Sequence, residues 1–240
     1  MTYYIVTGSS KGLGKSLVEL LLENENNIVY GLSRSNTIEH KNYNAIKIDL
    51  SHLDAVLNFQ FPKIKSADRI VLINNAGVVG DIKPIGELSN QKIIACYHIN
   101  LVAPSILVNN FIANYSHLNC EKTVLNISSG AGRAPVDGWS VYCATKSGID
   151  MFSQVLKEEA RLNNSPVKIL SLAPGVIDTE MQQEIRSADP SSFSKLAHSQ
   201  GYKSPGNLPH SSLVAKKVLR YLKEDKLAEN VLCSVRDLED

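Results

Sequence analysis

The chain has 240 residues, which is the length of one large α/β domain or of two small ones, since domains usually contain ~100 to 200 residues. Its composition, 43% hydrophobic and 20% charged, is typical of a folded globular protein and excludes disordered and fibrous classes. The net charge of +1 gives no broad basic surface, so we expect neither nucleic acid nor membrane as a partner.

Signals for export and for metal binding are missing from the sequence. Residues 1–14 contain no basic segment and only a short apolar stretch, so we expect no signal peptide. We also expect no membrane-spanning helix, because we find no apolar run near the required ~20 residues. The four cysteines are widely spaced and form no C-x-x-C motif, which indicates neither a zinc site nor a disulfide framework. These features predict a cytoplasmic protein without a metal.

Short runs rich in Ile and Val alternate with amphipathic segments along the chain. This alternation is typical of βαβ units that form a parallel sheet covered by helices on both faces. We therefore expect a single doubly wound α/β domain over residues 1–240, with a seven-stranded, mostly parallel sheet. The expected strands are Tyr3–Thr7, Ile28–Leu32, Ala45–Ile48, Ile70–Ile73, Thr123–Ile127, Val167–Leu172 and Asn230–Val235. The expected helices are Leu13–Glu23, Leu53–Asn58, Asn90–Tyr115, Ser140–Leu162, Thr179–Ser187 and Ser211–Lys223.

One stretch in the last third, from Asp189 to Pro209, has the Ser, Pro, Gly and Lys content of a loop. It follows an expected strand end at Pro174-Gly175, and loops after the carboxyl ends of parallel strands border the ligand crevice. A lid over the substrate and a plain solvated connection both remain open as interpretations. We assign the cofactor-binding part to residues 1–175 and the region of the lid to residues 176–210.

A glycine-rich turn, Thr7-Gly-Ser-Ser-Lys-Gly-Leu-Gly14, joins the first expected strand to the first helix. Gly8 permits a sharp turn, Gly12 lets a pyrophosphate approach the backbone, and Gly14 lets the helix pack close to the sheet. Free N–H groups at the helix start would face the phosphates. Because it stands between a strand and a helix, the turn predicts a dinucleotide site rather than an ordinary turn.

The end of the second strand, Gly-Leu-Ser33-Arg34-Ser, contains no acid. An acidic side chain there would bind a ribose 2′-hydroxyl and repel a 2′-phosphate. Arg34, Ser33 and Lys11 offer two cations and a hydroxyl to a phosphate, which favours NADP(H), although solvated surface charge is the usual fate of such cations. Asp49, at the end of the third strand, is a candidate acceptor for the adenine amino group or a cap of the following helix.

Tyr142 and Lys146 lie four residues apart in an expected helix, so their side chains share one face. A free tyrosine has a pKa near ~10, and a nearby cation lowers it. We therefore expect Lys146 to lower the pKa of Tyr142. Taken alone, the pair is also a common amphipathic pattern.

Several motifs together resemble those of the short-chain dehydrogenase/reductase family in its compact form. They run from Thr7 to Thr179 and comprise Thr7-Gly-x-x-x-Gly-x-Gly14, Asn74-Asn-Ala-Gly77, Asn100, Ser129, Tyr142-x-x-x-Lys146, and Pro174-Gly175 with Thr179. The resemblance implies a Rossmann fold and a catalytic tetrad of Asn100, Ser129, Tyr142 and Lys146. Ser129 is chosen over Ser128 because its separation from Tyr142 is the one usual in the family, and Ser128 then points to the opposite side of the strand.

The resemblance also implies roles in carbonyl reduction. Ser129 would stabilise the charge on the carbonyl oxygen, and Tyr142 would donate the proton. Lys146 would bind the ribose, while Asn100 would anchor a water that connects Lys146 to solvent. The residues implied to bind NADP(H) are Gly8, Ser10, Lys11, Gly12, Leu13, Gly14, Ser33, Arg34, Asp49, Leu50, Asn75, Ala76, Gly77, Tyr142, Lys146, Pro174, Gly175, Val176 and Thr179.

Two further segments, residues 138–152 and 174–181, are similar to the sepiapterin-reductase-like branch of this family, particularly to bacterial benzil reductases. This similarity implies an NADPH-dependent carbonyl reductase that converts an aromatic vicinal diketone to a chiral hydroxyketone. The candidates for the substrate pocket are Val136, Trp139 and Met181, although Trp and Met are more often core residues.

Other functions remain open beside this one. A carbonyl reductase acting on a pteridine, as sepiapterin reductase does, is the alternative substrate class. An NADP(H)-sensing binding protein without significant turnover, or an assembly subunit, would use the same fold for a different purpose. The long expected helices at 90–115 and 140–162 imply the family's usual contact in a homodimer or homotetramer.

Overall fold

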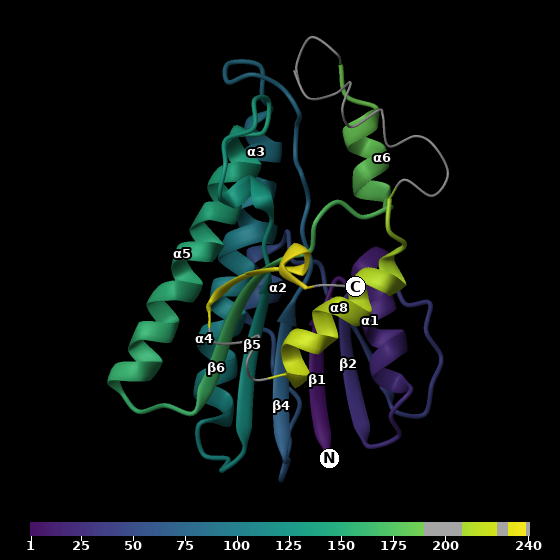
Figure 1. The fold of residues 1–240 in the computed structure, drawn as a ribbon, viewed down its shortest axis with the longest axis vertical. Coiled ribbons are helices and arrows are strands. Elements are labelled where there is room, and N and C mark those ends of the chain that lie inside the picture. The colour runs from purple at the N-terminus through teal and green to yellow at the C-terminus, as the bar shows by residue number, and fades with distance from the viewer. Residues whose placement is uncertain (190–207, 225–229, 239–240) are drawn as a thin grey trace.

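The computed structural model describes residues 1–189, 208–224 and 230–238, and shows a seven-stranded sheet between layers of helices (Figure 1). The strand order is β3-β2-β1-β4-β5-β6-β7, and the paired strands are parallel. From β1 the chain forms β2 and β3 on one side of β1 and then crosses over to form β4 to β7 on the other side. This reversal next to β1 is the switch point of a doubly wound sheet, where α/β proteins bind ligands. The expected fold class is confirmed.

The described elements lie close to those expected from the sequence. The strands are β1 (Thr2–Thr7), β2 (Asn27–Ser33), β3 (Tyr43–Lys47), β4 (Arg69–Asn74), β5 (Glu121–Ile127), β6 (Val167–Ala173) and β7 (Leu232–Ser234). The helices are α1 (Gly12–Leu22), α2 (Leu53–Leu57), α3 (Asn90–Tyr97), α4 (Ala103–Tyr115), α5 (Ser140–Leu162), α6 (Glu180–Arg186) and α8 (Ser211–Lys223). The last strand is shorter than expected, because the chain turns into a short 3-10 helix at Val235.

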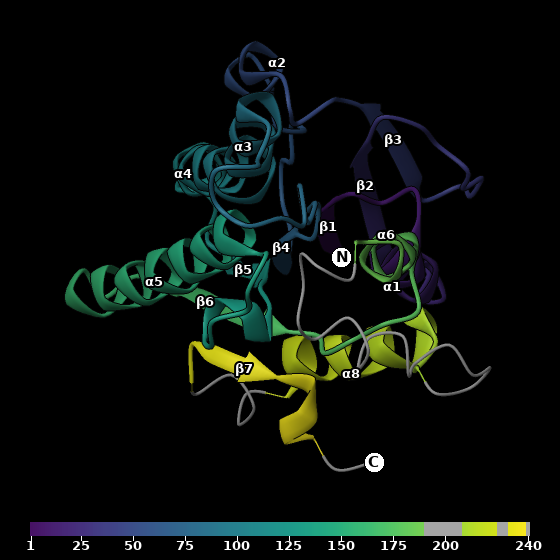
Figure 2. The same cartoon turned by 90° about the horizontal axis from the view of Figure 1, so that it is seen from above.

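Two apolar cores attach the helices to the sheet (Figure 2). On one face, α1 and α8 pack through side chains such as Leu17 and Val218. On the other face, α4 contributes Leu107 and Phe111, with α2 and α5 beside it. Because both faces are covered, the strands are continuous apolar runs, and all four residues of Ile70–Ile73 are fully buried.

The helix expected over Asn90–Tyr115 is interrupted at its centre. A π-helical segment, His98–Val102, separates α3 from α4. Pro104 has no N–H group and cannot bond the carbonyl of Asn100 one turn earlier, so the regular hydrogen-bond ladder is broken here. The distortion therefore lies at a residue expected to be catalytic.

The same stretch, Asn90–Tyr115, is apolar over a greater length than we expected from the sequence. It is 26 residues long, and by length and composition alone it could cross a membrane. A helix that covers the core of a soluble protein passes the same test, so this finding is weak evidence for a span. Here Leu107, Val108 and Phe111 are fully buried against the sheet.

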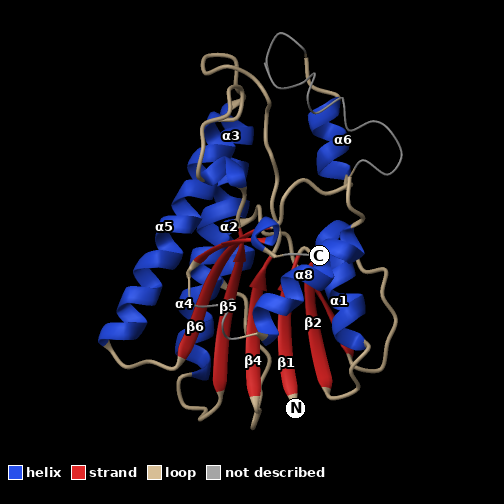
Figure 3. Ribbon diagram, viewed as in Figure 1, coloured by secondary structure: helices blue, strands red, loops and turns tan. Residues whose placement is uncertain are grey.

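The expected lid falls almost wholly outside the described residues, which end at Asp189 and resume at residue 208. The described part of this region is α6, which stands beyond the carboxyl ends of the strands (Figure 3). Helix α6 therefore forms one wall of the crevice at the carboxyl ends of the strands.

Candidate active site

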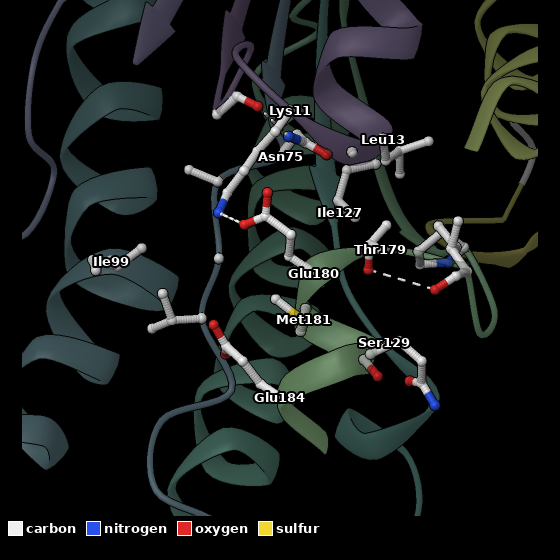
Figure 4. Close-up of a pocket in the computed structure, with 18 of the residues that line it drawn as sticks. Lys11, Leu13, Asn75, Ile99, Ile127, Ser129, Thr179, Glu180, Met181 and Glu184 are labelled. Atoms are coloured by element: carbon white, nitrogen blue, oxygen red, sulfur yellow. Dashed lines mark hydrogen bonds and ion pairs between the residues drawn. The ribbon is translucent and has the colours of Figure 1, made fainter. Parts of the chain in front are cut away.

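A cavity of about 400 Å³ opens at the carboxyl ends of the strands, between the glycine turn, α5 and α6 (Figure 4). Its wall contains all but one of the residues expected to bind the cofactor, Gly14 being the exception. The expected residues in the wall are Gly8, Ser10, Lys11, Gly12, Leu13, Ser33, Arg34, Asp49, Leu50, Asn75, Ala76, Gly77, Tyr142, Lys146, Pro174, Gly175, Val176 and Thr179. Ser129, Trp139 and Met181 line the same cavity.

The glycine turn has a geometry that side chains would prevent. Gly8 and Gly12 have φ angles of 67° and 54°, in the left-handed region that favours glycine. A Cβ at Gly14 would stand 2.2 Å from the Gly8 carbonyl oxygen, so this glycine allows α1 to pack against the turn. Asn75 Nδ2 donates to the carbonyls of Thr7 and Gly8 at 3.0 and 3.2 Å. The resulting backbone cradle fits the phosphates of a dinucleotide.

Arg34 and Asp49 stand together at the end of the cavity expected to hold adenosine. Asp49 accepts hydrogen bonds from the N–H and hydroxyl of Ser51 at 2.9 and 2.7 Å, so it closes the turn before α2 and does not cap the helix itself. Burial raises the pKa of Asp49, but these bonds and the charge of Arg34 outweigh it and hold that pKa below its ordinary value. Arg34 forms no hydrogen bond or ion pair within the ranges the structure describes.

Lys11, the second cation expected at a phosphate, forms an ion pair with Glu180, the first residue of α6 (Figure 4). The pair joins the glycine turn to the helix on the other side of the cavity. Ser33 lines the cavity, and its hydroxyl donates to the Ser35 carbonyl at 2.5 Å. No local pattern predicts the contact of Lys11 with Glu180, because the two residues are distant in the chain.

Ser129 and Tyr142 meet beside the cavity. The Ser129 hydroxyl hydrogen-bonds to Tyr142 and also accepts from the N–H of Ala131 at 3.2 Å. Ser128 is only 2% exposed, and its hydroxyl lies 3.5 Å from the carbonyl of Lys146. The two adjacent serines thus have different partners, and Ser129 is the one that reaches the tyrosine.

The pKa of Tyr142 is shifted in the direction opposite to the one expected, and the pKa of Lys146 is shifted as well. Burial raises the pKa of Tyr142 to about 12, and the Ser129 hydrogen bond opposes this only in part. Burial also lowers the pKa of Lys146 to about 8. Lys146 Nζ lies 5.7 Å from the centre of the Tyr142 ring and donates to the Ile127 carbonyl at 2.7 Å. Instead of the expected lowered pKa, the tyrosine is held in its protonated form.

Asn100 is buried beside the cavity and is not part of its wall. Its Oδ1 accepts from the Val78 N–H at 2.9 Å, and its Nδ2 donates to the Val78 carbonyl at 2.8 Å and the Thr145 hydroxyl at 3.1 Å. A Cβ at Gly77 would stand 3.4 Å from Asn100 Oδ1 and 3.7 Å from Lys146 Nζ. The missing side chain at Gly77 therefore leaves room between Asn100 and Lys146.

An ion pair that sequence reasoning missed, between the partly exposed Arg133 and the buried Asp150, connects the loop after Ser129 to α5. Arg133 Nε donates to Asp150 at 3.0 Å, and its other nitrogens donate to the carbonyls of Ser171 and Cys233 at 3.2 and 3.0 Å. The Ser171 hydroxyl donates to the second Asp150 oxygen at 2.6 Å. Asp150 lies one helical turn after Lys146 and raises its pKa, although the effect of burial is larger.

Apolar side chains gather on one side of Tyr142. The Trp139 and Tyr142 rings are 5.5 Å apart and nearly perpendicular. Val136 packs against this cluster without lining the cavity, whereas Trp139 and Met181 do both. Sequence reasoning missed Gln182 and Ile185, which also line the cavity. The spacing of four residues between Met181 and Ile185 along the expected helix was an available signal for Ile185. No such signal existed for Gln182, which is adjacent to Met181.

Comparison with known proteins shows which family the chain resembles. The family model described as short chain dehydrogenase matches residues 2–190. The chain is 37% identical over 242 residues to benzil reductase ((S)-benzoin forming) of Bacillus cereus, covering 95% of this chain and 97% of the relative. It is 30% identical over 250 residues to sepiapterin reductase of Mus musculus, covering 92% and 91%.

Among solved structures, the short-chain dehydrogenase/reductase of Saccharomyces cerevisiae matches with a TM-score of 0.81 at 26% identity, over 99% of this chain and 97% of that one. The expected resemblance, including its two branches, is confirmed. Fold, motif order and sequence similarity agree, and the chain belongs to the short-chain dehydrogenase family.

Proposed function

We propose that the protein is an NADPH-dependent carbonyl reductase that converts an aromatic vicinal diketone such as benzil to a chiral hydroxyketone. The observation that carries this proposal is the meeting of Ser129 and Tyr142 at a cavity with two unlike parts. One part is the backbone cradle of the glycine turn, and the other is an apolar wall that includes Trp139 and Met181. Similarity to a benzil reductase supports the substrate class.

Different residues of the cavity wall would bind different parts of NADPH. The glycine turn would hold the phosphates with its N–H groups, and Lys146 would hold the ribose. Arg34 and Lys11 would bind a 2′-phosphate, which favours NADPH over NADH. When bound, the reduced nicotinamide supplies the hydride that the carbonyl carbon accepts.

Tyr142 is the proton donor in this mechanism. Its raised pKa keeps the phenol protonated at neutral pH, so the proton leaves only when the carbonyl oxygen has become strongly basic. Ser129 donates a second hydrogen bond to the same oxygen and stabilises its developing charge. The reaction adds one hydride to carbon and one proton to oxygen.

Lys146 and Asn100 support the tyrosine after it has lost its proton. The ammonium of Lys146 lies over the ring and would stabilise the phenolate by its charge. Gly77 places no side chain beside Lys146 and Asn100, and a water held there would give a route for a new proton. This arrangement favours turnover over the alternative of a protein that only senses NADP(H).

We also propose that the protein works as a homodimer or homotetramer in the cytoplasm. Met151, Val155 and Leu162 are 60%, 48% and 63% exposed along α5. Exposed apolar side chains at helical spacing are typical of a protein interface. All four cysteines are free thiols, which suits a reducing compartment.

The test is to mix purified protein with NADPH and either benzil or sepiapterin and to follow the loss of cofactor absorbance. We expect turnover with benzil, slower turnover with NADH in place of NADPH, and a single benzoin enantiomer on chiral chromatography. Turnover of sepiapterin alone would favour the pteridine alternative. Cofactor binding without turnover of any carbonyl compound would contradict the proposed reaction.

A further inference from the structure

Gln182 is a buried amide in the cavity wall. Its side chain is on α6, it is only 6% exposed, and it lines the cavity. Its side chain forms no hydrogen bond with any residue in the part of the chain that the structure describes. Buried polar side chains nearly always have a hydrogen-bond partner, so an amide in this position points to a ligand that supplies one.

Gln182 lies between two described contacts of α6. Thr179, three residues earlier, is close to the glycine cradle, since a Cβ at Gly12 would stand 3.3 Å from Thr179 Cγ2. Ile185, three residues later, shares the helix face of Gln182 and belongs to the apolar cluster that contains Tyr142. From this position the Gln182 amide can reach a substrate bound beside Tyr142.

The surroundings of Gln182 make its amide selective. Trp139, Met181 and Ile185 supply apolar surface around this part of the cavity. In such surroundings a ligand without a hydrogen-bonding group leaves the Gln182 amide without a partner, which costs binding free energy. A ligand that has such a group forms a hydrogen bond with the amide. A substrate that fits has an apolar body and a second hydrogen-bonding oxygen near the reacting carbonyl.

We infer that Gln182 determines specificity by donating a hydrogen bond to the second carbonyl oxygen of a vicinal dicarbonyl substrate. This inference rests on the proposed function. The first oxygen accepts from Ser129 and Tyr142, while the oxygen on the adjacent carbon accepts from the Gln182 amide. Hydride and proton add to the first carbonyl only, and no bond to Gln182 forms or breaks. The second carbonyl stays a ketone, so reduction ends at the hydroxyketone.

The experiment compares two substrates that differ at one position, benzil and deoxybenzoin, in which a CH₂ group replaces one carbonyl. The ratio of their kcat/KM values is measured for wild type, Gln182→Met and Gln182→Glu. Methionine resembles glutamine in shape but cannot donate, and an ionised glutamate accepts only. We expect both substitutions to lower the benzil-to-deoxybenzoin ratio about tenfold, the loss of one hydrogen bond. Deoxybenzoin has no second carbonyl for Gln182 to bind, so Gln182→Met should lower its kcat/KM less than that of benzil.

Gln183→Met is the matched control, because Gln183 is the next residue of α6 and is exposed. Its ratio should equal that of wild type. Thermal unfolding checks that each variant is folded. If a Gln182 variant does not fold, Gln182→Leu is measured in its place. An unchanged ratio in the Gln182 variants overturns the inference while leaving benzil reduction intact.

Two other outcomes would contradict the inference about Gln182. Weaker NADPH binding by Gln182→Met at an unchanged ratio would assign the amide to the cofactor and overturn the inference. Wild-type protein that reduces neither diketone nor monoketone would contradict the proposed function itself, and the inference with it.

Discussion

The ammonium of Lys146 lies over the ring of Tyr142, with Nζ 5.7 Å from the ring centre. Burial moves the pKa values of both groups, raising that of Tyr142 to about 12 and lowering that of Lys146 to about 8. At neutral pH the phenol is protonated and the ammonium is charged. This combination suits reduction, in which the phenol gives up its proton beside a cation that stabilises the phenolate.

Tyr142→Phe tests the proton donor. The change removes one hydroxyl with little change in shape, so the variant should fold and still bind NADPH. Its turnover should fall by ~10² to 10⁴, the usual contribution of general acid catalysis. The matched control is Tyr115→Phe, because the Tyr115 hydroxyl bonds the Pro62 carbonyl far from the cavity. Near-normal turnover in Tyr142→Phe would remove this residue from its role.

Arg34→Ala tests the choice of cofactor. Arg34 lines the cavity and has no hydrogen bond or ion pair among the described residues, so its guanidinium is available to a 2′-phosphate. NADPH affinity should fall by ~1.5 to 3 kcal/mol, the value of a hydrogen bond to a charged group. NADH affinity should hardly change. Fluorescence titration with both cofactors measures this, and equal wild-type affinities would contradict the assignment.

Glu180→Gln tests whether the ion pair with Lys11 competes with the cofactor. Without the carboxylate, Lys11 should bind a 2′-phosphate more strongly, so NADPH affinity should rise a few-fold and NADH affinity should not. The effect should be small, because both side chains are more than half exposed and such pairs contribute ~0 to 1 kcal/mol. Glu184→Gln is the control on the same helix and cavity wall. Weaker NADPH binding by Glu180→Gln would argue against competition.

Lys146→Met tests the buried charge through the pH dependence of stability. The pKa of Lys146 is lowered from 10.5 to about 8, so the unfolded chain holds its proton to higher pH than the folded one. Burial of the charge therefore destabilises the wild type most below pH 8, and the penalty disappears as pH rises toward 10.5. Relative to Lys146→Met, the wild type should gain up to about 3 kcal/mol over this range. Urea unfolding at several pH values measures the difference, and a constant difference would contradict the shift.

Arg133→Ala tests the ion pair between the serine loop and α5. The change leaves the buried Asp150 carboxylate without its cation, which should destabilise the fold by on the order of 3 kcal/mol. Arg161→Ala, which breaks a solvent-exposed pair with Glu158 on the same helix, is the matched control and should destabilise the fold much less. Urea unfolding measures the free energy of unfolding of both variants. Equal losses would show that the Arg133–Asp150 pair stabilises the fold no more than the exposed pair does.

The sequence was sufficient for features that depend on local patterns. Strand runs such as Ile70–Ile73 and the glycine turn from Gly8 to Gly14 are visible because backbone conformation and side-chain periodicity are properties of neighbouring residues. The pairing of Tyr142 with Lys146 follows from helical spacing in the same way. These local signals were enough to predict the sheet and its helices, while the family resemblance implied most of the residues of the cavity wall.

Tertiary structure decided whatever depends on contacts between distant segments. The bond from Lys11 to Glu180 and the cluster of Arg133 with Asp150 join elements whose approach no local pattern encodes. The pKa of Tyr142 moved opposite to expectation, because burial by the whole fold outweighs the effect expected from its neighbour. Helical spacing alone could not show that Gln182 is buried and its neighbour Gln183 exposed, since that depends on which face of α6 the rest of the chain covers.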